Sequence, residues 1–198
     1  RLFRYPSLRA IVNRMGFNNA GVRKIAANIK KARKKGLRLK VGGNIGKNVT
    51  TPIENAADDY RICALLLAEQ VDYLVLNVSS PNTPGLRNLQ TQKALSNIVE
   101  NVLSVFVSKP IFIKVAPDNY EGFIDDVAEV VKKFSLAGVI CGNTLLNHAS
   151  ARNISDMDLA LLPQGGLSGA PIFEINLNLA TEYVKKGLFI IGVGGIQN

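Results

Sequence analysis

Short apolar runs rich in β-branched residues alternate along this chain with longer segments of helical periodicity. Such alternation predicts buried parallel strands joined by crossover helices, with helices covering the sheet. The expected strands span residues 39–43, 73–78, 110–115, 138–141 and 188–193. The expected helices lie near residues 22–35, 52–69, 90–107, 120–134 and 173–186. The sequence therefore predicts an α/β fold with a parallel sheet.

Polar or glycine-rich clusters follow every expected strand, and they distinguish between two α/β architectures. A doubly wound sheet gathers its functional loops at one switch point, whereas a β/α barrel draws them from the carboxyl ends of all strands. The clusters are GGNIGKN, NVSSPNTPG, KVAPD, GNT and GVGG. They favour a (β/α)8 TIM barrel. Because five strands do not close a barrel of eight, we expect an incomplete central fragment without the first and last strands, with residues 1–198 forming one partial domain.

Two local expectations concern the segments between these strands. Thr51, Pro52 and Glu54 have the spacing of a helix cap, a first-turn proline and a capping-box glutamate, so we expect the second helix to open there. Residues 147–165 have no firm pattern, and we expect them to form a loop.

The net charge of +9 is concentrated in one segment. Nine of the 24 basic residues lie within residues 22–40, which contain no acid, and the other 15 are balanced by 15 acidic residues. Apolar residues at helical spacing in this segment favour a solvated helix face. An anionic membrane surface is the second interpretation. Nucleic acid is the least favoured, because no aromatic residues are interleaved for base stacking.

Other function classes find little support in the sequence. Cys63 and Cys141 stand in apolar contexts without metal-like spacing, so we expect two packing thiols and no metal site. No apolar run reaches the roughly 18 residues that a membrane-spanning helix needs.

Several loops offer side chains suited to a polar heterocycle. The segment NVSSPNTPG, residues 77–85, joins amides and hydroxyls to prolines and a glycine that fix the backbone, although each residue type is also an ordinary turn former. Asparagine amides both donate and accept, which suits a ligand with alternating C=O and N–H edges, such as a pyrimidine. The residues that could form this amide-rich rim are Asn13, Asn44, Asn77, Asn82 and Asn143.

Charge and phosphate recognition are suggested elsewhere. Lys114 is the only charged residue in its strand, so it either faces a ligand or extends to a barrel rim or a structural acid. Its ammonium could stabilise negative charge on a reduced flavin. Gly194 and Gly195 would let backbone N–H groups approach a phosphate, but they also suit a simple turn. The GGLSG segment at residues 165–169 is equally ambiguous.

Taken together, these motifs resemble the dihydroorotate dehydrogenase family. NRMGFNN, NIGKN, NVSSPNTPGLR, IKVAPD, GGLSG and IIGVGGI occur in the family's order and cover essentially all 198 residues. Ser80 stands where the soluble class of the family carries a cysteine base, which is similar to the quinone-dependent, membrane-associated class. The resemblance implies that Ser80 is the catalytic base and that Arg4 lines the quinone site.

The resemblance also implies two sets of binding residues, and it assigns no metal. The substrate-binding set is Asn13, Arg14, Met15, Gly16, Phe17, Asn77, Asn82, Asn143 and Thr144. The FMN-binding set is Asn44, Asn77, Lys114, Gly142, Ser168, Gly169, Gly194 and Gly195. The implied activity is oxidation of (S)-dihydroorotate to orotate with FMN and a quinone, in de novo pyrimidine biosynthesis.

The resemblance implies a cellular location as well as an activity. We expect peripheral association with the bacterial or mitochondrial inner membrane through a segment N-terminal to this chain, and no nucleic-acid partner. Gly142 departs from the family's usual threonine or serine, so a side-chain contact to flavin would be lost. The first strands and the last strand of the barrel are also absent, with half of the phosphate site, so we expect the chain alone to bind FMN poorly. The alternatives are another phosphate- or flavin-binding TIM-barrel enzyme, a soluble-class dihydroorotate dehydrogenase, or a barrel that has lost its activity.

Overall fold

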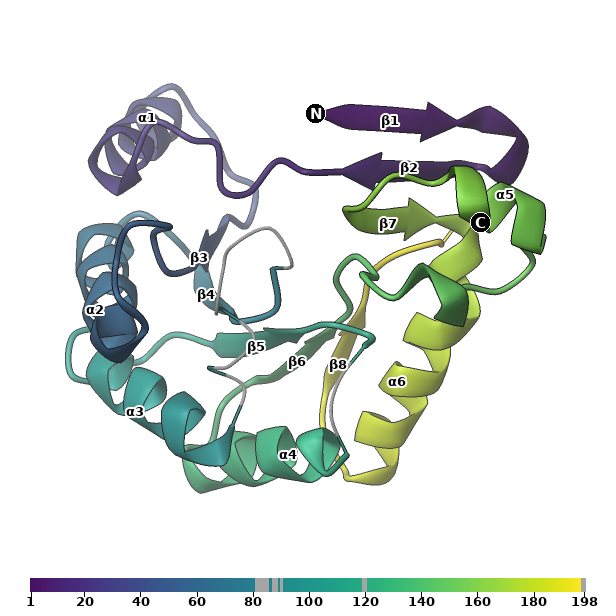
Figure 1. Ribbon diagram of the computed structural model, residues 1–198. Helices are drawn as coiled ribbons and strands as arrows, with labels where there is room; N and C mark the ends of the chain where they lie inside the picture. Colours follow the sequence, from purple (N-terminus) through teal and green to yellow (C-terminus); the bar gives the residue numbers. More distant parts are fainter. Residues whose placement is uncertain (81–85, 87–88, 90, 119–120, 197–198) are drawn as a thin grey trace.

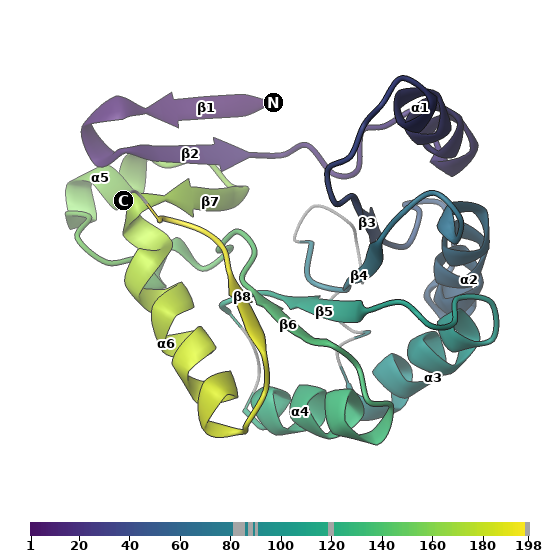
Figure 2. The ribbon, with the colours of Figure 1, turned by 180° about the vertical axis from the view of Figure 1, so that it is seen from behind.

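A computed structural model describes residues 1–80, 86, 89, 91–118 and 121–196. Within these residues, five parallel strands form one sheet in which neighbours follow chain order (Figure 1). The strands are β3 (Gly42–Ile45), β4 (Tyr73–Asn77), β5 (Ile111–Val115), β6 (Gly138–Cys141) and β8 (Ile190–Gly192). The helices are α1 (Val22–Lys34), α2 (Ala56–Leu67), α3 (Gln92–Leu103), α4 (Phe123–Lys133) and α6 (Phe173–Lys185). The sheet is curved, and Figures 1 and 2 show α2, α3, α4 and α6 on its convex outer face.

The α/β fold predicted from the sequence is confirmed, with two corrections at element boundaries. The first strand begins at Gly42 rather than residue 39, because pairing with β4 starts at Tyr73, and Leu39 is 73% exposed. The capping box at Thr51 is wrong. Residues Ile53–Asn55 form a 3-10 turn, helix α2 begins at Ala56, and its N-cap Asn55 makes no side-chain hydrogen bond.

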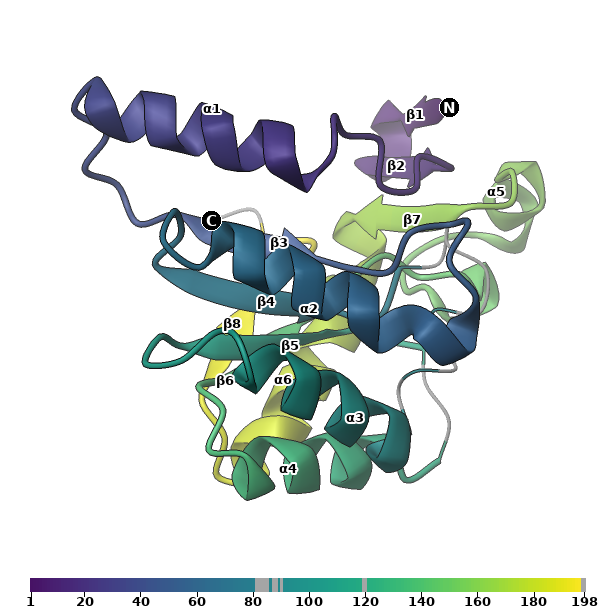
Figure 3. The ribbon, with the colours of Figure 1, turned by 90° about the vertical axis from the view of Figure 1, so that its left-hand side faces the viewer.

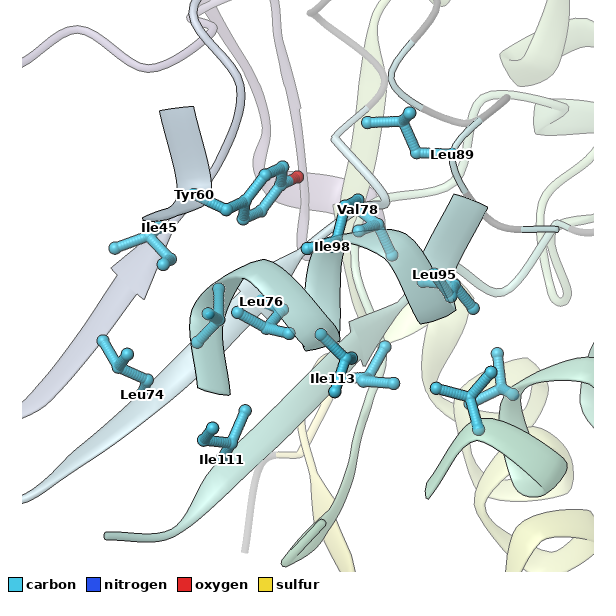
Figure 4. Close-up of a cluster of buried hydrophobic side chains, with 14 of the residues drawn as sticks. Ile45, Tyr60, Leu74, Leu76, Val78, Leu89, Leu95, Ile98, Ile111 and Ile113 are labelled. Atoms are coloured by element: carbon cyan, nitrogen blue, oxygen red, sulfur yellow. The ribbon is translucent and has the colours of Figure 1, made fainter. Parts of the chain in front are cut away.

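The main core lies between the sheet and its helices. Side chains of a strand alternate between the two faces of a sheet, and Leu74, Leu76 and Ile113 face the helices, where they pack with Ile98 of α3 (Figure 4). The opposite, concave face carries a smaller apolar cluster centred on Val75, Phe112 and Ile140. Within β4 and β5, the residues two positions after Val75 and Phe112 therefore also point to the concave face.

A second sheet was missed by the sequence analysis. Strands β1 (Leu2–Tyr5), β2 (Ala10–Asn13) and β7 (Gly166–Gly169) pair antiparallel in the order β1-β2-β7. Figure 3 shows this sheet beside the carboxyl ends of the parallel strands. Leu145, which follows β6, exchanges two backbone hydrogen bonds with Leu167 of β7 and so joins the two parts.

Residues 147–165 are not one irregular loop. They contain a 3-10 turn at His148–Ser150 and helix α5 (Asp156–Leu161). The Ser155 side chain caps α5 by accepting a hydrogen bond from the Asp158 backbone N–H, which is why so short a segment is helical.

Helix α1 carries most of the basic segment, and its charges largely face solvent, as predicted. Arg33 is an exception, because it donates to the Asp72 carboxylate at 2.6 Å. The same carboxylate accepts from the Val41 backbone N–H at 2.8 Å. Asp72 therefore ties α1 to the segments that enter β3 and β4, and these two hydrogen bonds lower its pKa. In the described part of the chain, no helix is long and apolar enough to span a membrane.

Tyr60 anchors α2 to the end of β4. Its side chain is fully buried in the main core (Figure 4), and its hydroxyl donates to the Asn77 backbone carbonyl at 2.9 Å. Burial raises the pKa of Tyr60 far above its ordinary value, so the hydroxyl remains a donor. This contact fixes the backbone of the residue that ends the strand.

We predict that Asp72→Asn lowers the free energy of unfolding at neutral pH, because the carboxylate gains its partners only in the folded chain. A carboxyl with a lowered folded pKa stabilises above its ordinary pKa of about 4 and loses that contribution as pH falls. Urea unfolding at pH 7 and near pH 3 should show the wild-type advantage shrinking in acid. Asp58→Asn, at an exposed 3.8 Å pair with Arg61, is the control and should show little effect. An Asp72→Asn effect independent of pH would contradict this.

We also predict that Tyr60→Phe lowers the free energy of unfolding by about 1 kcal/mol or more, because the buried Asn77 carbonyl loses its donor. Tyr5→Phe is the matched control, since the Tyr5 hydroxyl reaches the Leu161 carbonyl at 3.3 Å in an exposed setting. Its effect should stay below about 0.5 kcal/mol. Equal losses in the two variants, measured by denaturant titration, would count against an anchoring role for Tyr60.

Candidate functional site

The carboxyl ends of β3, β4 and β5 place three polar side chains on the concave face. Asn77 lies two residues beyond Val75, and Lys114 lies two residues beyond Phe112, so both point to the side of that apolar cluster. The parallel register pairs Asn77 with Lys114 across the two strands. Asn44 of β3 is paired with Val75 and belongs to the same face. These residues therefore line one side of the sheet above an apolar floor.

Lys114 is a half-buried cation on this face. Its register partners are Asn77 on one side and Ile140 of β6 on the other. Burial lowers its pKa, because desolvation penalises the ammonium. An ammonium held in such surroundings is available to stabilise negative charge on a bound group.

The ends of β4 and β6 are joined by a small hydrogen-bonded cluster. The Asn77 Oδ1 accepts from the Ser79 backbone N–H and hydroxyl, each at 3.3 Å, and from the Asn143 Nδ2 at 3.4 Å. The Asn143 Nδ2 also donates to the Ser79 Oγ at 2.9 Å. The Asn143 Oδ1 accepts from the Thr144 backbone N–H at 2.9 Å. Two amides of the expected rim are thus brought together and oriented.

Ser80 follows this cluster directly and is only 6% exposed. Its side chain is therefore largely shielded from water. Asn82 of the expected substrate set lies outside the described residues.

The Asn13–Phe17 segment approaches from the antiparallel sheet. The Asn13 Nδ2 donates to the Gly166 carbonyl at 3.3 Å, and its Oδ1 accepts from the Met15 backbone N–H at 3.3 Å. The Phe17 ring lies against Gly46, where an added Cβ would be 2.8 Å from the ring. A pocket of about 450 Å³ is lined by Arg14, Met15, Gly16, Phe17, Asn18, Asn48 and Val49. Aromatic and amide groups therefore border one wall of the site.

The GGLSG segment is strand β7 rather than a free glycine loop. The Ser168 hydroxyl donates to the Ile11 carbonyl at 3.2 Å. Gly169 has a φ of +102°, and a Cβ there would lie 2.2 Å from the Arg9 carbonyl oxygen. The close approach of β2 gives these residues a structural role, whatever ligand they also meet. Arg4 lies on β1, paired with Ile11.

The glycines after β6 and β8 lie close to helix α6. Phe173 is the first residue of α6, and a Cβ on Gly195 would be 2.8 Å from its backbone nitrogen. A Cβ on Gly194 would meet the Asn176 Nδ2 at 2.5 Å. The Gly194-Gly195 turn is thus pressed against the amino end of a helix, where phosphate groups are favoured.

The structure changes the interpretation of Gly142. A Cβ at this position would point at the Asn176 Oδ1, 2.3 Å away on α6, rather than into open space on the concave face. The absence of a side chain at Gly142 therefore makes room for Asn176 of α6, and does not open space on the concave face.

Two further residues near the site were missed. Lys47, in the NIGKN motif, is only 3% exposed, and its Nζ donates to the Asn48 and Thr51 carbonyls at 2.7 Å each, which folds this loop over the end of β3. Asn176 carried no recognisable sequence pattern.

Among the described residues, no cluster of three or more His, Cys, Asp or Glu side chains could hold a metal ion.

The described residues fit a flavin mononucleotide. Asn44, Asn77 and Lys114 present amides and a cation along the strand ends. Gly195 lines a pocket of about 470 Å³ together with Phe173, the first residue of α6, and this pocket offers space for a phosphate. The apolar surface of Val75, Phe112 and Ile140 suits a planar ring beneath those polar groups.

Comparison with known proteins gives the family. The family model described as dihydroorotate dehydrogenase matches residues 1–198. Relatives called dihydroorotate dehydrogenase (quinone) include that of Corynebacterium diphtheriae, 41% identical over 200 residues with 100% of this chain and 54% of the relative covered. That of Neisseria meningitidis serogroup A is 43% identical over 208 residues, covering 100% and 60%. The chain therefore spans between half and two thirds of the length of these relatives.

Solved structures agree with this result. The ligand-free DHODH from Eimeria tenella superposes with a TM-score of 0.88 at 31% identity, covering 100% of this chain and 61% of that one. The complex of the Eimeria tenella enzyme with ferulenol gives a TM-score of 0.87 at 30% identity, covering 100% and 59%. The five parallel strands correspond to part of the TIM barrel of these proteins, as the sequence predicted. The chain belongs to the dihydroorotate dehydrogenase family.

Proposed function

We propose that this chain is the central part of a quinone-dependent dihydroorotate dehydrogenase that oxidises (S)-dihydroorotate to orotate in pyrimidine biosynthesis. The observation that carries the proposal is the joining of Asn77, Ser79 and Asn143 by hydrogen bonds beside Lys114, on one face of the sheet. The names of the relatives support the choice of the quinone class.

The amides recognise the substrate. Asn77 and Asn143 each offer a donor and an acceptor, which matches the alternating C=O and N–H edge of the dihydropyrimidine ring. Because their orientation is fixed by Ser79 and by the Thr144 backbone, they hold the ring without a further ordering cost. Asn13 and Phe17 close the opposite wall, and Asn82 is proposed to complete the set.

Ser80 takes the proton from C5 of the substrate. A serine hydroxyl is a weak base, so it depends on its nearly water-free position and on neighbouring polar groups that receive the proton in turn. FMN, held by Asn44, Asn77 and Lys114, would supply a hydride acceptor for the hydrogen at C6 and a carrier of electrons to a quinone. The Lys114 ammonium would stabilise negative charge on the bound cofactor.

The remaining assignments follow from the same proposal. Gly194, Gly195 and the amino end of α6 would hold the cofactor phosphate, while Gly142, Ser168 and Gly169 border the cofactor through their backbone. Arg4, on the exposed hairpin, would face the incoming quinone. The whole protein would bind the bacterial or mitochondrial inner membrane peripherally through a segment N-terminal to this chain.

We predict that anaerobic addition of dihydroorotate to the full-length protein bleaches its yellow flavin absorbance. Ser80→Ala should slow this bleaching by about 100-fold or more, because proton removal at C5 loses its base. Ser80→Cys should retain more of the rate than Ser80→Ala, since a thiol ionises near pH 8.5 and its thiolate can accept the proton, whereas alanine has no group that can. Ser104→Ala, at an exposed helix end, is the control and should bleach normally. A flavin that dihydroorotate leaves unbleached in the wild type would refute the proposed activity.

We further predict opposite effects of Lys114→Met on stability and on the flavin. The flavin-free variant should unfold at a higher temperature, because a folded lysine with a lowered pKa carries a desolvation cost at every pH below that pKa. The reduction potential of bound flavin should fall, since the reduced ring loses a neighbouring cation. Lys30→Met, on the exposed face of α1, should change neither quantity. An unchanged reduction potential would remove Lys114 from the flavin site.

A further inference from the structure

Asn176 has an unusual environment for a helix residue. It lies in the first turn of α6, is 4% exposed, and both its Oδ1 and its Nδ2 are buried without a hydrogen-bond partner in the described structure. An unsatisfied buried polar atom costs about 1–3 kcal/mol. An apolar side chain would avoid that cost, so packing alone does not account for an amide at this position.

The carboxamide occupies the place of a side chain at position 142. The three atoms nearest to a Cβ built on Gly142 all belong to Asn176: Oδ1 at 2.3 Å, Cγ at 3.1 Å and Nδ2 at 3.7 Å. The φ of Gly142 lies outside the left-handed region, so its backbone would accept another residue. Asn176 is therefore what excludes a side chain from position 142.

The same carboxamide contacts the turn after β8. A Cβ on Gly194 would lie 2.5 Å from the Asn176 Nδ2. The two strand ends are themselves linked, because the Gly142 N–H donates to the Val193 carbonyl at 3.0 Å. Asn176 thus lies beneath the junction of the two glycine segments that follow β6 and β8.

Gly142 also connects this junction to the amide cluster. The next residue is Asn143, whose Nδ2 donates to the Ser79 Oγ at 2.9 Å and to the Asn77 Oδ1 at 3.4 Å. Hydrogen bonds weaken steeply once the donor angle falls below about 120°, so a shift of the Asn143 backbone that turns its amide would weaken both. The position of the Gly142 backbone against the Asn176 carboxamide therefore determines whether the Asn143 amide can donate to both Ser79 and Asn77.

We propose that Asn176 is a positioning residue of the site: its carboxamide replaces a side chain at position 142 and holds the Gly142–Asn143 backbone where the Asn143 amide engages Asn77, Ser79 and the substrate ring. This inference rests on the proposed function, because it assigns Asn143 to orotate binding. It makes Gly142 and Asn176 a coupled pair. A larger side chain at position 142 collides with the Asn176 carboxamide, and a smaller side chain at position 176 leaves the space beside Gly142 unfilled.

The experiment is a double-mutant cycle in the full-length protein, with orotate affinity measured from the change in the absorption spectrum of bound FMN. Asn176→Ala should weaken orotate binding about tenfold, because the Gly142 backbone loses its support. Gly142→Ser should weaken it at least as much through the clash with Oδ1. The double variant Gly142→Ser, Asn176→Ala should return to within about threefold of the wild type, because the serine side chain fills the space that the amide vacates. Asn178→Ala, on the exposed face of the same helix, is the matched control and should bind normally.

The outcomes separate the two levels of the argument. Thermal unfolding of every variant shows whether a loss of binding is merely a loss of folding, and rescue by the double variant supports the pair even where Gly142→Ser does not fold. If the wild type binds FMN and orotate and Asn176→Ala binds orotate equally well, the function stands and the positioning role is overturned. The positioning role would also be overturned if the double variant lost orotate affinity by the product of the two single-variant losses, because the two positions would then act independently. If the wild type itself binds neither, the proposed function fails and this inference falls with it.

Discussion

The packing of helices against one face of the parallel sheet is the constraint on which the site depends. Leu74, Leu76 and Ile113 are buried under α2 and α3, and strand side chains alternate strictly between faces. Asn77 and Lys114 are consequently directed to the concave face, where Val75 and Phe112 lie before them. A slip of one residue in either strand would place these polar groups in the apolar core, so the core fixes the register and the register fixes the site.

The polar groups on the concave face differ in how their burial is compensated. Asn77 is satisfied on both sides: its backbone carbonyl by Tyr60 and its side chain by Ser79 and Asn143. Lys114 is half-buried, and desolvation lowers its pKa. A fold that holds a partly desolvated cation beside oriented amides gives up some stability at that position. Functional sites commonly show this exchange of stability for preorganisation.

The elements with strong local patterns could be predicted from the sequence. The strands that begin at Tyr73 and Gly138 are nearly continuous apolar runs, and α4 repeats its apolar residues at helical spacing. Each element can therefore be recognised from its own short stretch of sequence. Strand β7 could not be found in this way, because it is short, contains two glycines and pairs with β2, more than 150 residues away. The capping box at Thr51 failed because the carbonyl of Thr51 is used by Lys47 and the chain makes a 3-10 turn before α2.

The candidate site likewise contains residues that a local sequence pattern predicts and one residue that depends on contacts distant in the sequence. Asn77, Asn143 and Lys114 end strands whose positions were predictable, so their meeting could be expected from the topology of a parallel sheet. The role of Asn176 could not, since it depends on the absence of a side chain at Gly142, 34 positions earlier, and on the path of α6 over two strand ends. A contact between a helix residue and a missing Cβ leaves no periodic trace in the sequence.

The most direct test of this account is a crystal structure of the full-length protein grown with FMN and orotate. The account predicts the flavin on the concave face with its ring beside Lys114, and the orotate ring within hydrogen-bond distance of the Asn77 and Asn143 amides and close to Ser80. Ligands bound at the amino ends of the parallel strands, or a flavin remote from Lys114, would contradict it.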